Sequence, residues 1–138
     1  MEKKAIIKVS SLQLSGESDK IEVISKGLFK RLENRYEVSY EESEISGMEG
    51  TTTTVKIEDD KVILERKGTT ESLIVFENEG SHVSLYNTPY GMLELVTNTK
   101  ALEVDVDDNG GSVKIDYEIA IAGQEPIKTN LTLEVSAK

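Results

Sequence analysis

Side chains that could do chemistry are concentrated in YEESEISGMEGTTTTVKI, residues 40–57, where four glutamates precede four consecutive threonines. Two neighbouring carboxylates can act as general acid and general base, and hydroxyls around a partly buried carboxylate can orient a polar ligand. Acid–base chemistry depends on the distance between the carboxylates, and no accompanying residues indicate a reaction class. We therefore expect this segment to bind a ligand rather than to catalyse a reaction, and we predict no catalytic residue.

The segment DVDDNGGSVKID has acidic residues at the spacing of a metal site. Asp105, Asp107, Asn109 and Gly110 match the opening of a calcium loop, D-x-[DN]-x-[DN]-G, and Asp116 occupies its last position. Calcium loops usually end on a bidentate glutamate and lie between helices, whereas the flanking residues here alternate as strands do. We predict a hairpin turn at DNGG with outward aspartates, and no metal.

The chain has one histidine, His82, and no cysteine. Disulfides, thiolate ligands, a cysteine–histidine nucleophile and a histidine-rich metal site are therefore excluded. His82 is out of phase with Val83 and Leu85, which predicts a surface side chain. A glycosylation sequon at residues 130–132 lies inside a predicted strand, and we treat it as chance. No cofactor is predicted.

The formal net charge of −10 is unevenly distributed along the chain. Residues 1–35 carry eight Lys/Arg against five Asp/Glu, and residues 36–138 carry eight against twenty-one, which gives +3 and −13. An acidic surface disfavours direct nucleic-acid binding and is compatible with a basic protein partner. We expect the N-terminal MEKKAIIKVSSLQLSG to be neither a signal peptide nor a membrane span. We expect one soluble, cytoplasmic domain over residues 1–138.

Alternation of apolar and polar residues with a period of two predicts strands along most of the chain. It is clearest in SVKIDYEIAIA and IKTNLTLEVSA, residues 112–122 and 127–137. Turn sequences such as EDD, NEG, NTPYG, DNGG and AGQEP recur about every ten residues. We predict an all-β, antiparallel, up-and-down meander of about eight to ten strands that closes into a barrel, since closure hides the edge strands. A two-sheet sandwich has the same periodicity and stays an alternative.

Two N-terminal segments are less regular. The apolar residues of KAIIKVSSLQL change phase at Ser10 and Ser11, which predicts a bulge. In ISKGLFKRLENR, residues 24–35, the apolar residues also have helical spacing, so an amphipathic helix competes with a strand. Gly27 and the turn-like ENR favour a bent strand, followed by a second strand in RYEVSY.

The segments GMEGTTTTVKIEDDKVILERKG, NTPYG and DVDDNGGSVKIDYEI, in this order, resemble the YwiB-like family of uncharacterised bacterial proteins. The similarity extends over nearly the whole chain. It implies a closed antiparallel barrel of the lipocalin-like, calycin type and a cytoplasmic setting in Firmicute-like bacteria, and it implies no known activity. The chain has no tryptophan, so it lacks the Gly-x-Trp signature of secreted lipocalins, which weakens an inference of lipophilic cargo.

Alternation assigns the polar side chains of residues 40–57 to two faces. Tyr40, Glu42 and Glu44 share a face with the apolar residues before them, and Thr51 and Thr53 share a face with the apolar residues after them. This is a polar stripe of a sheet, or it is a site at the barrel mouth. The turn at TPYG lies at the rim of such a barrel. The predicted ligand-binding residues are Tyr40, Glu42, Glu44, Thr51, Thr53, Tyr86 and Tyr90.

These patterns favour a non-enzymatic barrel that binds a small polar or amphipathic molecule in its interior. The alternative is a protein-interaction module that binds a basic partner through its acidic exterior or a sheet edge. Both functions leave homo-oligomerisation open. A polar pocket around Glu42 distinguishes them, because only the first function requires one.

Overall fold

A computed structural model describes residues 2–13, 19–42, 49–68, 71–78, 80–88, 91–121 and 125–137. The described residues form ten strands: β1 (Glu2–Gln13), β2 (Asp19–Arg31), β3 (Tyr36–Glu41), β4 (Thr52–Ile57), β5 (Lys61–Lys67), β6 (Glu71–Glu77), β7 (Ser81–Thr88), β8 (Gly91–Asp107), β9 (Gly110–Ile121) and β10 (Ile127–Ala137). Within these ranges no helix is long and apolar enough to cross a membrane.

Each strand pairs antiparallel with the next along the chain, and β1 also pairs with β10 from Ala5↔Ala137 to Gln13↔Thr129. The ring of strands is therefore closed, which confirms the predicted up-and-down barrel and excludes the two-sheet sandwich. In a closed ring, every second side chain of each strand is directed into a single interior.

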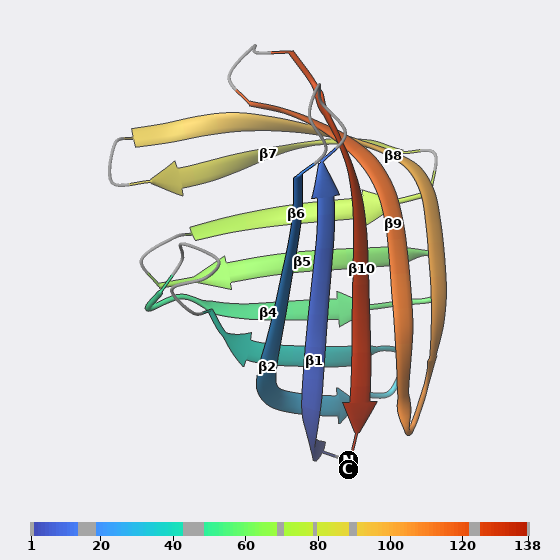
Figure 1. Cartoon of the computed structure of the whole chain (residues 1–138). Coiled ribbons are helices and arrows are strands. Elements are labelled where there is room, and N and C mark those ends of the chain that lie inside the picture. Colours follow the sequence, from blue (N-terminus) through green and yellow to red (C-terminus); the bar gives the residue numbers. More distant parts are fainter. Residues whose placement is uncertain are drawn as a thin grey trace.

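The strands form two walls that cross each other, one made of β3 to β7 and the other of β1, β9 and β10 (Figure 1). Two strands bend at a corner and belong to both walls. Figure 1 shows β2 and β8 curving between the two walls. In β2 the corner is at Gly27, which pairs with Ala5 of β1 and Tyr40 of β3. In β8 the register shifts between Thr99 and Ala101. A glycine and a bulge are the usual ways to bend a strand at a barrel corner.

The strand predicted within residues 24–35, the turn at ENR and the second strand after it are confirmed, since β2 ends at Arg31 and β3 begins at Tyr36. Phe29 is fully buried, whereas Ile24, Leu28 and Leu32 are exposed. The helical spacing therefore arose from apolar residues on the outside of the strand.

The bulge predicted at Ser10 and Ser11 is wrong. β1 keeps one register with β2 and with β10 through both serines. Val9 and Ser11 both line the interior, where the barrel is hollow. Because a serine is tolerated beside a cavity, the apolar pattern is interrupted there without a change in strand phase.

One end of the barrel interior is formed by almost fully buried apolar side chains. Ile7, Phe29, Val38 and Ile57 have 0–1% of their surface exposed. The Phe29 ring stacks on Tyr36 with a centroid distance of 5.2 Å and an interplanar angle of 5°. This packed end supplies a compact apolar core, and burial of each such side chain contributes about 1.5–3 kcal/mol.

The DNGG segment forms the predicted hairpin turn. β8 ends at Asp107 and β9 begins at Gly110, and these two residues pair with each other. Gly110 has a φ of 111°, which suits glycine. The Asp107 carboxylate accepts a hydrogen bond from the Asn109 backbone N–H at 2.8 Å, so it stabilises the turn. No cluster of metal-ligating side chains is found in the described part of the chain.

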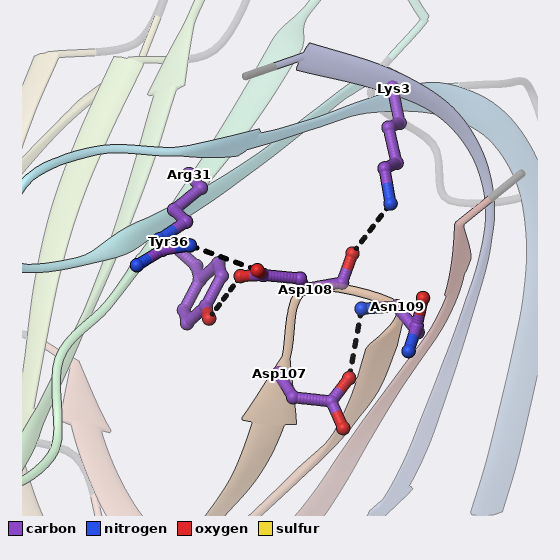
Figure 2. Close-up of polar contacts among 6 residues, drawn as sticks. All are labelled: Lys3, Arg31, Tyr36, Asp107, Asp108 and Asn109. Carbon is purple, nitrogen blue, oxygen red and sulfur yellow. Dashed lines mark hydrogen bonds and ion pairs between the residues drawn. The ribbon is translucent and has the colours of Figure 1, made fainter.

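Asp108, in the same turn, is hydrogen-bonded to side chains of three other strands at the packed end of the barrel (Figure 2). Its carboxylate accepts hydrogen bonds from the Tyr36 hydroxyl and from the Arg31 guanidinium, each at 2.9 Å. Its backbone carbonyl accepts one from Lys3 Nζ at 3.1 Å. The hydrogen bond to Asp108 is the main reason that the pKa of Tyr36 is raised. The β8–β9 turn is thereby tied to β1, β2 and β3.

The seam between β6 and β7 is the least regular part of the described barrel. Their ladder is limited to Glu71↔Asn87 and Ser72↔Tyr86. Val83 is 65% exposed, while His82 Nε2 lies 2.8 Å from Glu77 Oε1 and its side chain is 33% exposed. His82 thus lies at the surface, as predicted, and it pairs there with Glu77, which was not predicted. Because the ladder between β6 and β7 is short, the alternation of apolar residues in β7 does not predict which side chains are buried, and Val83 is exposed.

Substituting Gly27 by alanine tests the β2 corner. An added Cβ would collide with the Ser39 carbonyl oxygen and with Ile7 Cδ1. We expect Gly27→Ala to lower the free energy of unfolding by about 2–3 kcal/mol, measured by urea denaturation. The exposed neighbour Lys26 provides the control, and Lys26→Ala should change stability by less than about 0.5 kcal/mol. Equal stabilities of the two variants would show that the corner does not need glycine.

Candidate binding cavity

The hairpin of β3 and β4 directs the predicted polar side chains into the barrel. Tyr40 pairs with Thr53 across the two strands, and both are buried. Beyond the end of β3, the Glu42 backbone N–H donates to the Thr51 carbonyl at 2.8 Å. This bond extends the ladder by one step, so Glu42 keeps the inward phase of Tyr40.

Glu42 is a buried carboxylate with two polar neighbours. Its side chain is only 3% exposed. The Thr53 hydroxyl donates to Glu42 Oε2 at 2.9 Å, and Arg66 Nε lies 3.8 Å from the same oxygen. Arg66 comes from β5, directly opposite Thr53 in the β4–β5 ladder. Burying one charge without a partner is costly, so the cation and the hydroxyl together allow the carboxylate to remain inside.

Arg66 has hydrogen-bonding capacity that its protein neighbours do not use. Its Nε atom is buried and has no hydrogen-bond partner in the described part of the chain, since 3.8 Å to Glu42 is an ion-pair distance and not a hydrogen bond. The side chain is 20% exposed and lines the interior space. A buried donor without a partner is uncommon in folded proteins and calls for a cause.

Two tyrosines complete the polar end of the interior. Burial raises the pKa of Tyr40 to about 12, and the negative charge of Glu42 adds to this, while Arg66 and the hydrogen bond with Thr53 act in the opposite direction. Burial also raises the pKa of Tyr117, against smaller opposing effects of Arg66 and Thr129. Both phenols are therefore protonated at neutral pH, and both are influenced by the same guanidinium.

These side chains line a cavity of about 260 Å³. Strands from both walls of the barrel contribute to it, with the lining residues Val9, Ser11, Val23, Tyr40, Glu42, Leu64, Arg66, Ile74, Leu95, Tyr117, Ile119, Ile121 and Leu131. A smaller space of about 30 Å³ adjoins it toward the packed end and shares Tyr40, Leu64 and Arg66 with it. Ligand pockets usually have volumes of roughly 300–1,000 Å³, so this cavity lies just below the usual range and has room for a small molecule only.

A larger hollow of about 530 Å³ lies elsewhere, on β1 and β2. It is lined by two runs of consecutive residues on neighbouring strands, including Lys4, Lys26 and Leu28. Consecutive residues alternate between the two faces of a strand, so this hollow follows the strand surface and does not enter the barrel. The interior cavity is the better candidate for a binding site because it combines enclosure with convergent polar groups.

The structure brings together three of the predicted site residues, Tyr40, Glu42 and Thr53. Thr51 is buried beside them and contributes its backbone carbonyl to Glu42. Tyr86 lies in β7, and its side chain is not among those that the structure describes. Glu44 and Tyr90 lie outside the described residues. The cavity thus involves the centre of the predicted set, and its rim stays a prediction.

Sequence reasoning missed Arg66 and Tyr117. A signal for each was present, because Arg66 continues the period-two series of Val62 and Leu64 in KVILERK, and Tyr117 continues that of Val113 and Ile115. A charged residue that continues an inward-facing apolar series is also the pattern that identified Glu42 as a candidate. What the pattern does not give is that β5 and β9 place these side chains around the same space.

The fold and the cavity define a class of protein, a closed antiparallel β-barrel with an interior of small-molecule size. Residues 7–133 match the domain of unknown function DUF1934, and the chain belongs to that family. The chain is 27% identical over 124 residues to the uncharacterised β-barrel protein YwiB of Bacillus subtilis (strain 168). The aligned region covers 90% of this chain and 86% of that protein.

A crystal structure of the YwiB protein from Bacillus subtilis has the same fold. It matches with a TM-score of 0.90 at 25% sequence identity, over 99% of this chain and 93% of that one. The resemblance predicted from the TTTT, NTPYG and DNGG segments is therefore confirmed, as is the barrel.

The hydrogen bond from Thr53 to Glu42 can be tested by stability measurements. Thr53→Val keeps the shape of the side chain but leaves the buried carboxylate with one partner fewer. We expect a loss of about 1.5–3 kcal/mol in the free energy of unfolding, because a hydrogen bond to a buried charge is removed. Thr52 is exposed on the same strand, and Thr52→Val should have little effect. An equally small effect of both substitutions would argue against this bond.

The raised pKa of Tyr40 predicts a specific alkaline dependence of stability. A phenol whose pKa is higher in the folded state stabilises the fold fully below its unfolded value of 10, and this contribution is lost as the pH rises toward 12. Relative to Tyr40→Phe, the wild type should lose about 2 kcal/mol of unfolding free energy over this range. Denaturation at a series of pH values measures it. A pH-independent difference between the two proteins would contradict the burial of this phenol.

Proposed function

We propose that the protein binds a small polar or amphipathic molecule inside the barrel and does not act on it as an enzyme. The observation that carries this proposal is the cavity of about 260 Å³ whose polar end is the buried Glu42–Arg66 pair. Apolar side chains surround this pair, as is usual for ligand pockets with a few orienting polar groups.

The contrast between the two ends of the barrel interior supports this function. Phe29, Ile7 and Ile57 are almost fully buried, and none of them lines the cavity of about 260 Å³. The other end keeps both space and an ion pair. Buried ion pairs often stabilise a fold less than apolar residues of similar volume do. A binding role explains why the interior has Arg66 where a leucine would fill it.

The lining of the cavity favours binding over catalysis. Glu42 is the one carboxylate among the residues that line it in the described part of the chain. Chemistry that needs a second carboxylate as the opposite acid or base has no candidate there. His82 pairs with Glu77 and is not part of the lining.

The cellular setting is part of the same proposal. We place the protein in the cytoplasm of a bacterium and class its barrel as lipocalin-like. The relative from Bacillus subtilis supports the bacterial setting. The family resemblance of this chain's sequence motifs supports the cytoplasmic setting and the lipocalin-like class.

A second candidate function is the binding of a basic protein partner. The charge of −13 on residues 36–138 supports it, as do the short β6–β7 ladder and the exposed Leu73 and Val83 beside it. A sheet edge with unpaired backbone groups can accept a further strand. This candidate does not account for the cavity or for the buried ion pair, so we place it second.

Narrowing the cavity tests the binding function directly. Ser11 lines the cavity, whereas its neighbour Ser10 is directed outward and contacts Glu22. With the uncharged fluorophore N-phenylnaphthylamine as probe, we expect saturable binding to the wild type. Ser11→Trp should weaken binding about tenfold or more, because the indole ring occupies the space of the probe. Ser10→Trp should leave it unchanged.

The two variants form a matched pair. The wild type has no tryptophan, so each variant adds the same single indole ring. Circular dichroism and thermal melting show whether both remain folded. Binding that is equal in the two variants, or absent from the wild type, would remove the support for an interior site and favour the interaction function.

A further inference from the structure

Among the described residues, the polar end of the cavity contains one buried donor without a partner, Arg66 Nε. A guanidinium only donates hydrogen bonds, and the buried Nε of Arg66 has no partner in the described residues. The phenols of Tyr40 and Tyr117, by comparison, already have hydrogen-bond partners in Thr53 and Thr129, respectively. The Glu42 carboxylate likewise accepts from Thr53 and faces Arg66. A ligand that satisfies the Arg66 donor must therefore bring an acceptor.

The formal charges that line the cavity cancel. Glu42 contributes one negative charge and Arg66 one positive charge, and the other lining residues of the described chain are uncharged. An anionic ligand at Arg66 would approach the Glu42 carboxylate, and a cationic ligand at Glu42 would approach the guanidinium. In either case the interior would acquire a net charge in surroundings of low polarity, which is unfavourable. The pair thus disfavours ligands of both signs.

The remainder of the wall is apolar. Val23, Ile74, Leu95, Ile119 and Ile121 line the same space. Contact with these side chains favours a hydrocarbon body, since apolar surface is removed from water on both partners. The polar end and the apolar wall together describe an amphipathic ligand.

We propose that the cavity binds an uncharged amphipathic molecule whose polar end is a carbonyl-type acceptor, such as an amide, ester or ketone, placed against Arg66. This inference rests on the proposed binding function and narrows its ligand class. Glu42 then acts as an internal counter-ion that sets the charge preference of the site, and it is not required to contact the ligand.

Three probes with one alkyl chain test the charge preference, namely octanamide, octanoate and octylammonium. Isothermal titration calorimetry at neutral pH measures their affinities. In the wild type we expect octanamide to bind about tenfold more tightly than either ion. Glu42→Gln leaves Arg66 as the one formal charge in the lining, so octanoate should gain about tenfold relative to octanamide. Glu103→Gln removes the same charge from the exposed outer face of β8 and should change nothing.

Arg66→Gln provides the opposite test and protects against a folding defect in a single variant. It leaves Glu42 as the one charge, so octylammonium should gain on octanamide while octanoate weakens. Circular dichroism confirms that each variant is folded before titration. The two substitutions must shift the charge preference in opposite directions if the pair sets it.

The outcomes distinguish this inference from the function on which it rests. Tighter binding of octanoate or octylammonium than of octanamide to the wild type would overturn the inference and leave the binding function standing. Unchanged preferences in both variants would also overturn it. If none of the three probes, nor N-phenylnaphthylamine, binds to the wild type, the binding function itself fails.

Discussion

Closure of the strand ring through β1 is the constraint on which the rest of the structure depends. Because β1 pairs with β2 on one side and with β10 on the other, alternate side chains of all ten strands share one interior. Closure requires β2 and β8 to bend, and Gly27 and the register shift after Thr99 allow this. The turn at Asp108 is hydrogen-bonded to Lys3, Arg31 and Tyr36 and so joins β1, β2 and β3 at the packed end.

The interior that results has two regions, an apolar core that stabilises the fold and a cavity that is proposed to bind a ligand. Phe29 and its neighbours form the core and account for much of the apolar burial. In the cavity, the same alternation that buries Tyr40 also buries Glu42, and β5 supplies the compensating charge of Arg66. A neutral pair in an apolar cavity is tolerated by the fold, and it favours a neutral ligand for the same electrostatic reason. One physical argument therefore connects the stability of the barrel with the class of molecule that it is proposed to bind.

The sequence was sufficient for the fold and for part of the cavity. Period-two alternation gave the strands, and it correctly placed Tyr40, Glu42 and Thr53 on inward faces, because that phase is a local property. Arg66 was missed because its approach to Glu42 depends on the register between β4 and β5, which no local pattern encodes. Alternation gave a wrong result where burial no longer follows strand phase, at Ser11 beside the hollow and in β7, whose ladder to β6 is short.

Native mass spectrometry of the protein freshly purified from its own host tests the central claim, that the hollow end of the barrel is a binding site, most directly. The account predicts a mass above that of the 15.3 kDa chain. This excess should be lost on denaturation, with release of a small molecule that is uncharged at neutral pH. A native mass equal to that of the chain alone, in preparations that have not been exposed to detergent or organic solvent, would contradict the account.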